Sequence, residues 1–461
     1  MTETILPVTP VLSAYIAGAR DNPHPEHFRE LARRHVLDTL ASIVACRDLE
    51  PAELARNYAL KLSGDAGRSA VTILGTRDRA SIVDAVFASA MTGHGAEIND
   101  FIPSAFVQPG PAIVSAAISL AEQRGVSGEQ VLRAVICGYE LAGRIPKALG
   151  IDNLRRAGIA NHGVGPQFGT AAAAASLIGL TEDQIPHVLT YCAQQASGSW
   201  QWLLDVEHIE KSFVFAGMGA RDGLSAALMV EAGFRGVRDS LDNPGGWMTA
   251  QIFTGKDANR AYLTDGLGER TELDHTAYKR YPVGGPTQPA VEGLLRLLPE
   301  LDAAKVEKVT ITMPGRWQAF RDAAMAALNL RYLSAIILLD GKLDFVSAQS
   351  LERMHGDEAA RALMQKVEIA HDPAQEAKPG EPRTESARVV VEMTGGVRKE
   401  LYVGHVRGFP SHPMDRADVE AKALELMTPH LGAGRAADVV AAVGALQDMP
   451  KAGELAALIA R

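Results

Sequence analysis

Cysteine is scarce in this chain: there are three among 461 residues, all far apart in the sequence. Cys46, Cys137 and Cys192 form no C-x-x-C pair. This scarcity argues against a disulfide framework. It argues equally against a structural zinc site or an iron–sulfur cluster, because each of these needs several thiolates. We therefore expect a reduced protein whose function depends on none of these groups.

The chain also lacks an excess of positive charge. Lysine and arginine number 46 against 55 aspartates and glutamates, which gives a formal net charge of −9. Proteins that bind nucleic acids or anionic membranes use basic surfaces, so we expect neither as a partner. A small basic pocket for an acidic metabolite remains compatible with this balance.

Long hydrophobic runs are absent as well. The longest stretch of small apolar residues, 168–180, is shorter than the ~20 residues that span a bilayer. Residues 1–4 do not combine a basic start with an apolar run, so we expect no signal peptide. Together these features predict a soluble, cytoplasmic protein.

Hydrophobic periodicity predicts helices over the first part of the chain. Apolar residues recur at helical spacing in 27–46. Two capping boxes, at 127–130 and 181–184, predict the starts of further helices, because the hydroxyl can cap a free N–H while the glutamine reaches back. The Ala-rich stretch 169–180 predicts a helix that packs tightly inside a multi-helix layer.

The pattern changes after about residue 271. Residues 309–313 alternate, carry β-branched side chains and end at Pro-Gly, which predicts a strand. Residues 388–393 and 399–403 flank a Thr-Gly-Gly-Val turn, which predicts a hairpin. From residue 418 the pattern is helical again.

We therefore predict a mainly α fold with two domains. A large all-helical domain would comprise residues 1–270 and 405–461, so that both ends of the chain build it. A smaller α+β lid domain would comprise residues 271–404.

A first candidate site follows an apolar helix, where His94, Glu97, Asn99 and Asp100 come close together. The simplest interpretation is a helix end with polar caps. A metal site is a weaker interpretation: Glu97 and Asp100 are near enough in sequence, but no D-x-D-x-D-G loop follows.

Two further segments place polar groups beside apolar helices. Tyr139 and Arg144 lie on one such helix, where Glu140 and Arg144 could form an ordinary surface pair. The Gly-rich segment 161–170, which holds His162, precedes the Ala-rich helix and suits anion capture by helix N-terminal N–H groups. It is not a G-x-G-x-x-G fingerprint after a strand, so a dinucleotide site is unsupported.

Two lysines stand out. Lys211 precedes Ser-Phe-Val-Phe, and an ammonium group that enters such an apolar environment either reaches back to solvent or has a function. Lys279 and Arg280 precede a Pro/Gly-rich turn at the domain junction, where they could close over a carboxylate, although a charge pair beside a turn is usually solvated. No G-x-S-x-G, H-E-x-x-H or Walker A pattern occurs. These residues suit acid/base chemistry on a small anion.

At these segments the chain resembles the MmgE/PrpD family, whose members include 2-methylcitrate dehydratase, cis-aconitate decarboxylase and iminodisuccinate epimerase. The resemblance extends over nearly the whole chain. The motifs that carry it are LDTL at 37–40, the segment 94–100, GYE and GR within 138–144, FGTAAA at 168–173, the AG and ARDG motifs after Lys211, KRYP at 279–282, LDG at 339–341 and HPM at 412–414.

The resemblance implies a helical domain built from both chain ends, an α+β lid, and a site between them. It also implies a homodimer with a small carboxylate as substrate and with no metal or organic cofactor. The chain departs from the family pattern in places: HALDFDD reads HGAEIND at 94–100, and two family histidines fall at Gln108 and Gln288. A dehydratase of this kind must act without an iron–sulfur Lewis acid.

The step common to this family is proton removal from the carbon α to a carboxylate. It needs a base, and it needs cations that hold the developing enolate charge. The resemblance assigns the proton to His162 or Tyr139, the carboxylates and the intermediate to Lys211 and Lys279, and the orientation of a neighbour or protonation of a leaving group to Asp100. Substrate hydrogen bonds would come from Glu97, Gln108, Arg280 and Gln288.

Three reactions share this step. We expect a lyase that eliminates a β-substituent from a di- or tricarboxylate, as 2-methylcitrate dehydratase does. The alternatives are an epimerase of a dicarboxylate such as iminodisuccinate, and a decarboxylase. A helical protein that binds a metabolite without converting it is the non-enzymatic interpretation.

Overall fold

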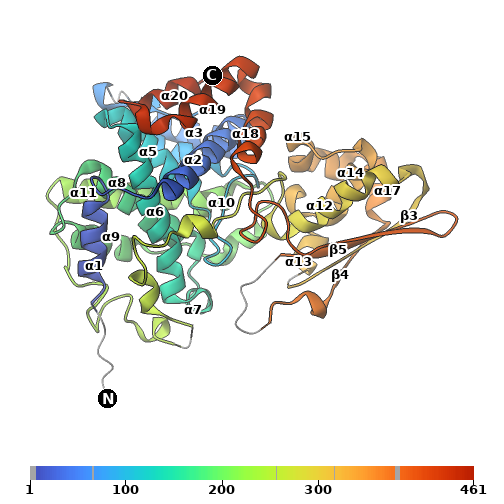
Figure 1. Ribbon diagram of the computed structural model, residues 1–461, viewed down its shortest axis with the longest axis horizontal. Helices are drawn as coiled ribbons and strands as arrows, with labels where there is room; N and C mark the ends of the chain where they lie inside the picture. Colours follow the sequence, from blue (N-terminus) through green and yellow to red (C-terminus); the bar gives the residue numbers. More distant parts are fainter. Residues whose placement is uncertain (1–6, 65–66, 256, 316, 379–384) are drawn as a thin grey trace.

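The computed structural model describes residues 7–64, 67–255, 257–315, 317–378 and 385–461. It has the mainly α fold that the sequence predicts, with one small sheet late in the chain (Figure 1). The helices up to residue 231 are α1 (Thr9–Gly18), α2 (Glu26–Cys46), α3 (Glu50–Ser63), α4 (Ile82–Gly93), α5 (Gly110–Arg124), α6 (Gly128–Leu149), α7 (Ile151–Arg156), α8 (Asn161–Ile178), α9 (Ile185–Gln195), α10 (Ile209–Ser212) and α11 (Met218–Glu231).

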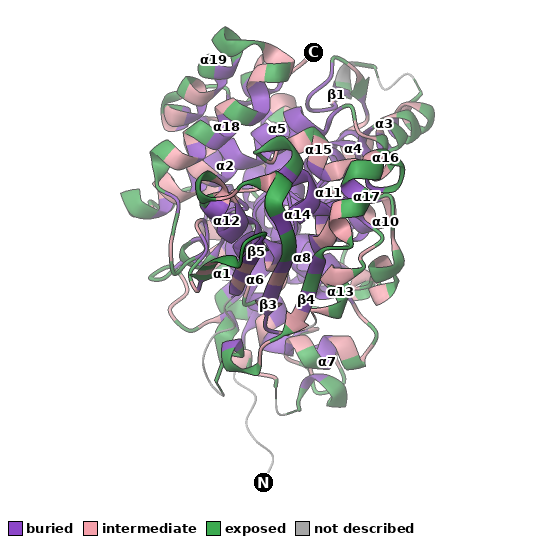
Figure 2. Ribbon diagram, turned by 90° about the vertical axis from the view of Figure 1, so that its right-hand side faces the viewer, coloured by how far each residue is buried: buried purple, intermediate pink, exposed green. Residues whose placement is uncertain are grey.

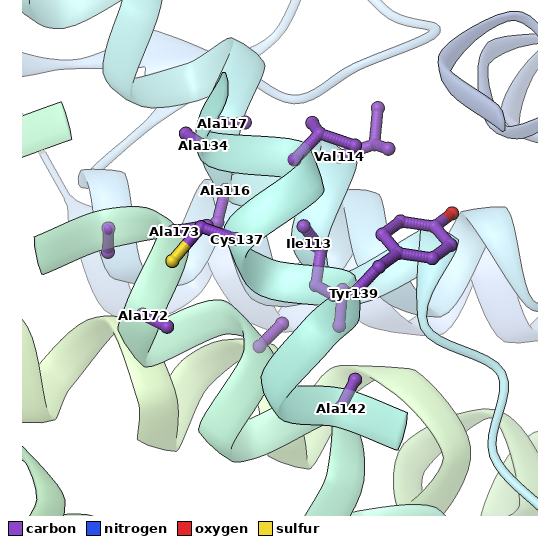
Figure 3. Packing of buried hydrophobic residues seen from close by; sticks show 14 of the residues in the cluster. Ile113, Val114, Ala116, Ala117, Ala134, Cys137, Tyr139, Ala142, Ala172 and Ala173 are labelled. Carbon is purple, nitrogen blue, oxygen red and sulfur yellow. The ribbon is translucent and has the colours of Figure 1, made fainter. Parts of the chain in front are cut away.

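The centre of the helical region is the packing of α6 against α8. A Cβ atom on Gly138 of α6 would lie 3.0 Å from the carbonyl oxygen of Gly169, and one on Gly169 would lie 2.6 Å from that of Gly138. The backbones can approach this closely only because both residues are glycines. Small buried side chains such as Ala142 and Ala172 surround the contact (Figure 3). The tight helical layer expected from the Ala-rich sequence is present.

Helix α8 begins earlier than the sequence suggests. The segment 161–170 was expected to be a Gly-rich loop, yet it is helical from Asn161, with Pro166 inside the helix. Proline costs a helix the bond to the carbonyl four residues before it, yet α8 stays helical here and packs against α6 and α11. A Cβ on Gly165 would lie 2.6 Å from the Ala142 carbonyl oxygen, so this glycine lets α8 reach α6. His162 therefore lies in the first turn of a helix.

Another helix is built from three segments that join end to end. Helix α10, a π-helical turn at Phe213–Gly217 and helix α11 follow one another without a break. The resulting helix, Ile209–Glu231, is long and apolar enough to cross a membrane, but 72% of its most apolar window is buried inside the protein. Such burial is typical of the core helix of a soluble protein.

The C-terminal segment returns to the helical region. Helices α18 (Arg416–Leu431), α19 (Ala433–Gly444) and α20 (Leu455–Leu458) lie beside α2 and α5, and their apolar residues belong to the same core (Figure 1). Lys422 of α18 is buried there and donates hydrogen bonds to Asp38 Oδ1 at 2.6 Å and to the Ile98 carbonyl at 2.7 Å. The end of the chain thus supports the loop after α4.

The sheet region has its own core. Its four strands are arranged in the order β4-β3-β5-β6, with β3 parallel to β4 and antiparallel to β5, and β5 antiparallel to β6. The predicted hairpin is present, and its turn contains Gly395 and Gly396 at φ of 80° and 74°. The elements are β3 (Val306–Met313), β4 (Val367–His371), β5 (Ala387–Met393), β6 (Val397–Val403), α12 (Gln288–Leu297), α13 (Gln318–Arg321), α14 (Leu330–Asp340), α15 (Phe345–Gln349), α16 (Leu351–Gly356) and α17 (Glu358–Met364).

The two regions meet at a short extended crossing. Phe101 and Ala277 exchange backbone hydrogen bonds at 3.0 and 2.7 Å, and the Tyr278 N–H donates to the Gly408 carbonyl at 2.8 Å. Figure 2 looks at the molecule from the side of the sheet and shows buried residues through the centre of the view. This crossing carries Lys279 into the interior, next to the loop after α4.

The three cysteines are free and buried. Burial raises the pKa of the Cys46 thiol to about 12, and it raises the pKa of Cys137 and Cys192 as well. All three thiols are therefore protonated at neutral pH and serve as small apolar side chains.

The described chain also contains the short hairpin β1 (Val71–Thr72) and β2 (Arg79–Ala80).

Candidate active site

A buried carboxylate collects three basic side chains from distant parts of the chain. Glu97 lies in the loop between α4 and α5, and its side chain is 3% exposed. Its Oε1 accepts from Lys211 Nζ of α10 and lies 3.2 Å from His208 Nε2. Its Oε2 accepts from Lys279 Nζ at 2.8 Å. We refer to Glu97, His208, Lys211 and Lys279 as the Glu97 cluster.

The pKa values within the Glu97 cluster show which groups are charged. Burial alone would raise the pKa of Glu97, but Lys211 and Lys279 beside it hold that pKa well below its ordinary value. Burial lowers the pKa of Lys211, and Glu97 offsets part of this effect. Burial also lowers the pKa of His208, against the pull of Glu97. At neutral pH the carboxylate is ionised and His208 is neutral, with its Nε2 proton on the side of Glu97, since a carboxylate only accepts.

The loop that holds Glu97 is fixed by its own polar residues. His94 ends α4, and its Nδ1 lies 2.6 Å from Asn99 Oδ1. The Asn99 amide donates to the Asp100 carbonyl at 2.9 Å. Asn99 therefore has a structural function in the loop, whereas Glu97 points to the lysines.

His162 lies next to this cluster against an aromatic wall. Its ring stacks on Phe215 with centroids 3.9 Å apart and an interplanar angle of 9°, and it meets Trp202 edge-on at 5.0 Å. Its Nδ1 lies 3.2 Å from Gln108 Oε1. Burial first, and then the positive charge of Lys211, lowers the pKa of His162 well below its ordinary value. With Nδ1 donating to the Gln108 oxygen, Nε2 carries the lone pair of a neutral imidazole.

The same aromatic wall shields one of the lysines. Lys211 Nζ lies 5.4 Å from the Trp202 ring centroid and 5.3 Å from that of Phe215. Aromatic faces attract a cation when water is excluded. The lysine therefore stays inside the protein and does not reach back to solvent.

Two histidines near Glu97, His208 and His94, were given no role in the predicted chemistry, although His94 belongs to the first candidate site. His208 has a left-handed backbone at φ 66°, which is uncommon for a residue other than glycine. Its position three residues before Lys211 is the sequence signal that could have indicated it. His94 stacks on Phe215 at 4.9 Å, and burial together with His208 lowers its pKa well below the ordinary value. Both rings add neutral hydrogen-bonding groups to the site.

His94, Glu97 and His208 have the spacing of a metal site. Their ligand atoms lie within 4.8 Å of one another. However, both oxygens of Glu97 bond to lysine ammonium groups, and a divalent cation would have to displace them against their positive charge. The residues present fit an anion better than a metal ion.

Asp100 and Tyr139 meet in a second buried group. The Tyr139 hydroxyl donates to Asp100 Oδ2 at 2.5 Å, and His35 Nδ1 lies 2.8 Å from the same oxygen. Burial, followed by the negative charge of Asp100, raises the pKa of Tyr139 well above its ordinary value. Asp38, paired with Lys422, lies close enough to influence Tyr139 as well. We call His35, Asp38, Asp100, Tyr139 and Lys422 the Asp100 cluster.

The structure brings neither Arg280 nor Gln288 to the Glu97 cluster. Arg280 forms an exposed ion pair with Glu425 of α18 at 3.1 Å. The Gln288 amide is buried and bonds to the backbone of the preceding turn: its Nε2 donates to the Tyr281 and Val283 carbonyls at 2.7 Å, and its Oε1 accepts from the Tyr281 N–H. Gln288 therefore stabilises the turn. Neither side chain contacts a residue of the Glu97 cluster in this structure.

The Glu97 cluster is a buried group in which two ammonium groups and one carboxylate lie beside the neutral imidazole of His162, next to the crossing between the helical and sheet regions. The chain belongs to the MmgE/PrpD family. The family model for the MmgE/PrpD N-terminal domain matches residues 11–261, and the model for the MmgE/PrpD C-terminal domain matches residues 281–447.

Curated relatives include fungal proteins of this family. The chain is 25% identical over 398 residues to the cis-aconitate decarboxylase-like protein oryM of Aspergillus oryzae, covering 79% of each chain. It is 31% identical over 203 residues to a cis-aconitate decarboxylase of Aspergillus terreus, covering 41% of this chain and 40% of that protein. These likenesses support an enzyme of a carboxylate lyase or decarboxylase family.

Proposed function

We propose that this protein is a lyase that removes a proton α to the carboxylate of a small substrate and eliminates a β-substituent, without a metal or organic cofactor. The observation that carries this proposal is the pair of buried ammonium groups, Lys211 and Lys279, beside the neutral imidazole of His162. Cations that hold a carboxylate stabilise the enolate that forms when the α-proton leaves.

In this mechanism His162 is the base. Its Nε2 takes the α-proton, and the electron pair of the C–H bond moves into the carboxylate as an enolate held by Lys211 and Lys279. The pair then forms the carbon–carbon double bond while the β-substituent leaves with its bonding electrons and takes up a proton. Tyr139 is the weaker candidate base, because its hydroxyl already donates to Asp100 and its pKa is raised.

Decarboxylation is the second candidate, because both relatives described above are named for it. In that reaction the bond to a carboxylate carbon breaks, CO₂ leaves, and the electron pair stays on the substrate as a carbanion that is then protonated. The same lysines and His162 could serve it. Epimerisation differs only in that the proton returns to the opposite face.

The test is turnover of small carboxylates by the wild-type protein and by His162→Ala, Lys279→Ala and Tyr139→Phe. We expect kcat/KM to fall about 10²–10⁴-fold without the base and about 10²–10³-fold without the lysine, with a much smaller loss for Tyr139→Phe. Absorbance of a new double bond identifies a lyase, released CO₂ a decarboxylase, and deuterium uptake from D₂O with retained structure an epimerase. Near wild-type kcat/KM in both His162→Ala and Lys279→Ala would contradict the assignment.

A further inference from the structure

The groups that the proposed reaction needs are closed off from solvent. Glu97, His162, Lys211 and Lys279 are each 5% exposed or less. A substrate has to reach Lys211 Nζ and His162 Nε2, so part of the protein that covers these two groups has to move before it binds. The aromatic rings around them indicate which part this is.

Three rings lie against His162, and they differ in how they are held. Phe215 is 2% exposed and belongs to the long buried helix that also carries Lys211. Trp200 and Trp202, whose ring centroids lie 5.6 and 5.0 Å from that of His162, belong to a surface segment. Trp202 also lies against Lys211. Withdrawal of this surface segment would therefore uncover both groups.

We call residues 199–207 the cover segment, and it is weakly attached to the rest of the protein. No residue of it is buried, and Leu204 is 79% exposed. Within the part of the chain that the structure describes, no backbone-to-backbone hydrogen bond joins it to another helix or strand. It is attached through side chains, by hydrogen bonds from Trp200 Nε1 to the Ile159 carbonyl at 3.1 Å, from Gln201 Nε2 to Glu210 Oε1 at 2.7 Å, and from the Lys211 N–H to Asp205 Oδ2 at 2.7 Å. A segment with so few bonds opens at a low cost in free energy.

Trp202 has an unsatisfied polar group while the cover segment is closed. Its indole Nε1 is buried and has no hydrogen-bond partner among the described residues. A buried donor without a partner is unfavourable, and the indole N–H regains a hydrogen bond when it reaches water. This gain offsets part of the contact energy that the ring loses on moving outward.

The two ends of the cover segment are suited to act as hinges. Gly198 and His208, which flank it, have positive φ angles of 100° and 66°. Hinges are a few residues between elements that absorb a change in φ and ψ, and glycine does so most easily. His208 is held at both ring nitrogens, by Ser212 Oγ at 3.0 Å and by Glu97 Oε1 at 3.2 Å. The side chain of this hinge is therefore anchored in the Glu97 cluster while the segment before it turns.

We propose that the cover segment is the gate of the active site. It turns about Gly198 and His208, withdraws Trp202 from His162 and Lys211 to admit a small carboxylate, and then closes again. This inference rests on the proposed function, since it takes His162 and Lys211 as groups that touch the substrate. The gate lies in the helical region, apart from the α+β region that the sequence predicts as a lid.

The test compares two buried lysines during acetylation by N-hydroxysuccinimidyl acetate, measured by peptide mass spectrometry. Lys211 and Lys422 both bond to a carboxylate, and burial lowers the pKa of both, but only Lys211 lies beneath Trp202. We expect Lys211 to react at least about tenfold faster than Lys422, because opening of the gate costs less free energy than the unfolding that exposes Lys422.

A cross-link tests whether this excess depends on the gate. In Gln201→Cys/Glu210→Cys the native cysteines are buried, and oxidation joins the two new thiols and ties the cover segment to α10. The faster acetylation of Lys211 should disappear in the oxidised form and return on reduction. If a small carboxylate is converted, kcat/KM of the oxidised form should be at least about tenfold below that of its reduced form.

Trp202→Ala tests the same gate without a cross-link. It should raise the rate of Lys211 acetylation at least about fivefold, while Leu204→Ala, an exposed position on the same segment, should leave the rate unchanged. Equal rates for Lys211 and Lys422 in the wild-type protein, or a Lys211 rate that neither the cross-link nor Trp202→Ala changes, would overturn the inference. Acetylation does not require turnover, so failure of the proposed lyase would leave this result standing.

Discussion

Two groups of buried lysines and carboxylates lie close together in this protein, and they differ in how the charges are matched. In the Asp100 cluster, Lys422 pairs with Asp38 at 2.6 Å and donates a second hydrogen bond to the Ile98 carbonyl. In the Glu97 cluster, two lysines share a single carboxylate. The Lys422–Asp38 pair matches one positive charge with one negative charge, whereas the second ammonium charge of the Glu97 cluster has no carboxylate of its own.

The difference extends to the elements that supply the residues. Lys422 and Asp38 come from α18 and α2, which pack in one continuous hydrophobic core. Lys279 comes from the crossing between the helical and sheet regions, and Lys211 from α10 beside an aromatic wall. The comparison suggests that the first pair holds the fold and that the second group binds the substrate, and each prediction below tests one side of it.

The largest effect on stability is expected for Lys422→Met. It leaves Asp38 buried without its partner, and breaking a buried ion pair in this way costs about 3–5 kcal/mol of unfolding free energy. Burial already raises the pKa of Asp38. In the variant, Asp38 can therefore take up a proton, which should bring the loss of unfolding free energy toward the lower end of this range. Urea denaturation measures it, and Lys61→Met at an exposed position should change stability by no more than about 0.5 kcal/mol. Equal stability of the two variants would refute the structural function of Lys422.

Lys211→Met should show the opposite pattern. We expect kcat/KM to fall about 10²–10³-fold, as for the loss of one group that stabilises an oxyanion. The loss of stability should be smaller than in Lys422→Met, because Lys279 still neutralises Glu97. Steady-state kinetics and urea denaturation of both variants give the comparison directly. If Lys422→Met loses more activity per folded molecule than Lys211→Met, the division between the two clusters is incorrect.

The pH dependence of stability should also reflect the Glu97 site. His94, His162 and His208 have lowered pKa values in the folded protein, so below the ordinary histidine value of ~6.5 the unfolded chain binds more protons. Unfolding free energy should therefore be level above about pH 7 and fall as the pH decreases from ~6.5. Glu97, whose pKa is also lowered, keeps its contribution until the pH falls below ~4.5.

Denaturation midpoints at several pH values between 5 and 8 measure this effect, and His162→Gln should have a shallower slope than the wild-type protein. The acid limb of kcat/KM should likewise lie below ~6.5, because His162 must be neutral to act as the base. Stability that increases from pH 7 to pH 5.5 would contradict the assignment of neutral buried histidines.

Much of the fold follows from local sequence patterns. Periodicity predicts α2, the capping box at 127–130 precedes α6, and the Thr-Gly-Gly-Val turn joins β5 and β6. The predicted start of α8 was wrong. Glycines and Pro166 favour a loop locally, but close packing against α6 favours the helix. The box at 181–184 forms its Thr181–Gln184 contacts, yet α9 begins only at Ile185. Strand β4 was not predicted, since its pairing with β3 is a tertiary interaction.

The candidate site was predictable in residue type more than in arrangement. Lys211, Lys279 and His162 stand out from their sequence context, and the structure places all three around Glu97 or beside it. No local pattern indicates that Asp100 and Tyr139 would pair with each other, or that the Gln288 amide would be used on backbone groups. Such pairings depend on which helices and strands pack together. They follow no fixed spacing along the sequence, so a local pattern does not predict them.

The smallest effect on activity and stability is expected for Arg280, which belongs to neither buried cluster. Its pair with Glu425 has side chains that are 36% and 55% exposed, and such pairs contribute little because water screens them. In Arg280→Ala we expect kcat/KM to stay within about twofold of the wild-type value and stability to change by about 0.5 kcal/mol or less. The resemblance to the family instead assigns Arg280 to the substrate. A loss of kcat/KM above tenfold would support that assignment and would require the crossing at 277–280 to rearrange when substrate binds, since Arg280 pairs with the exposed Glu425 in this structure.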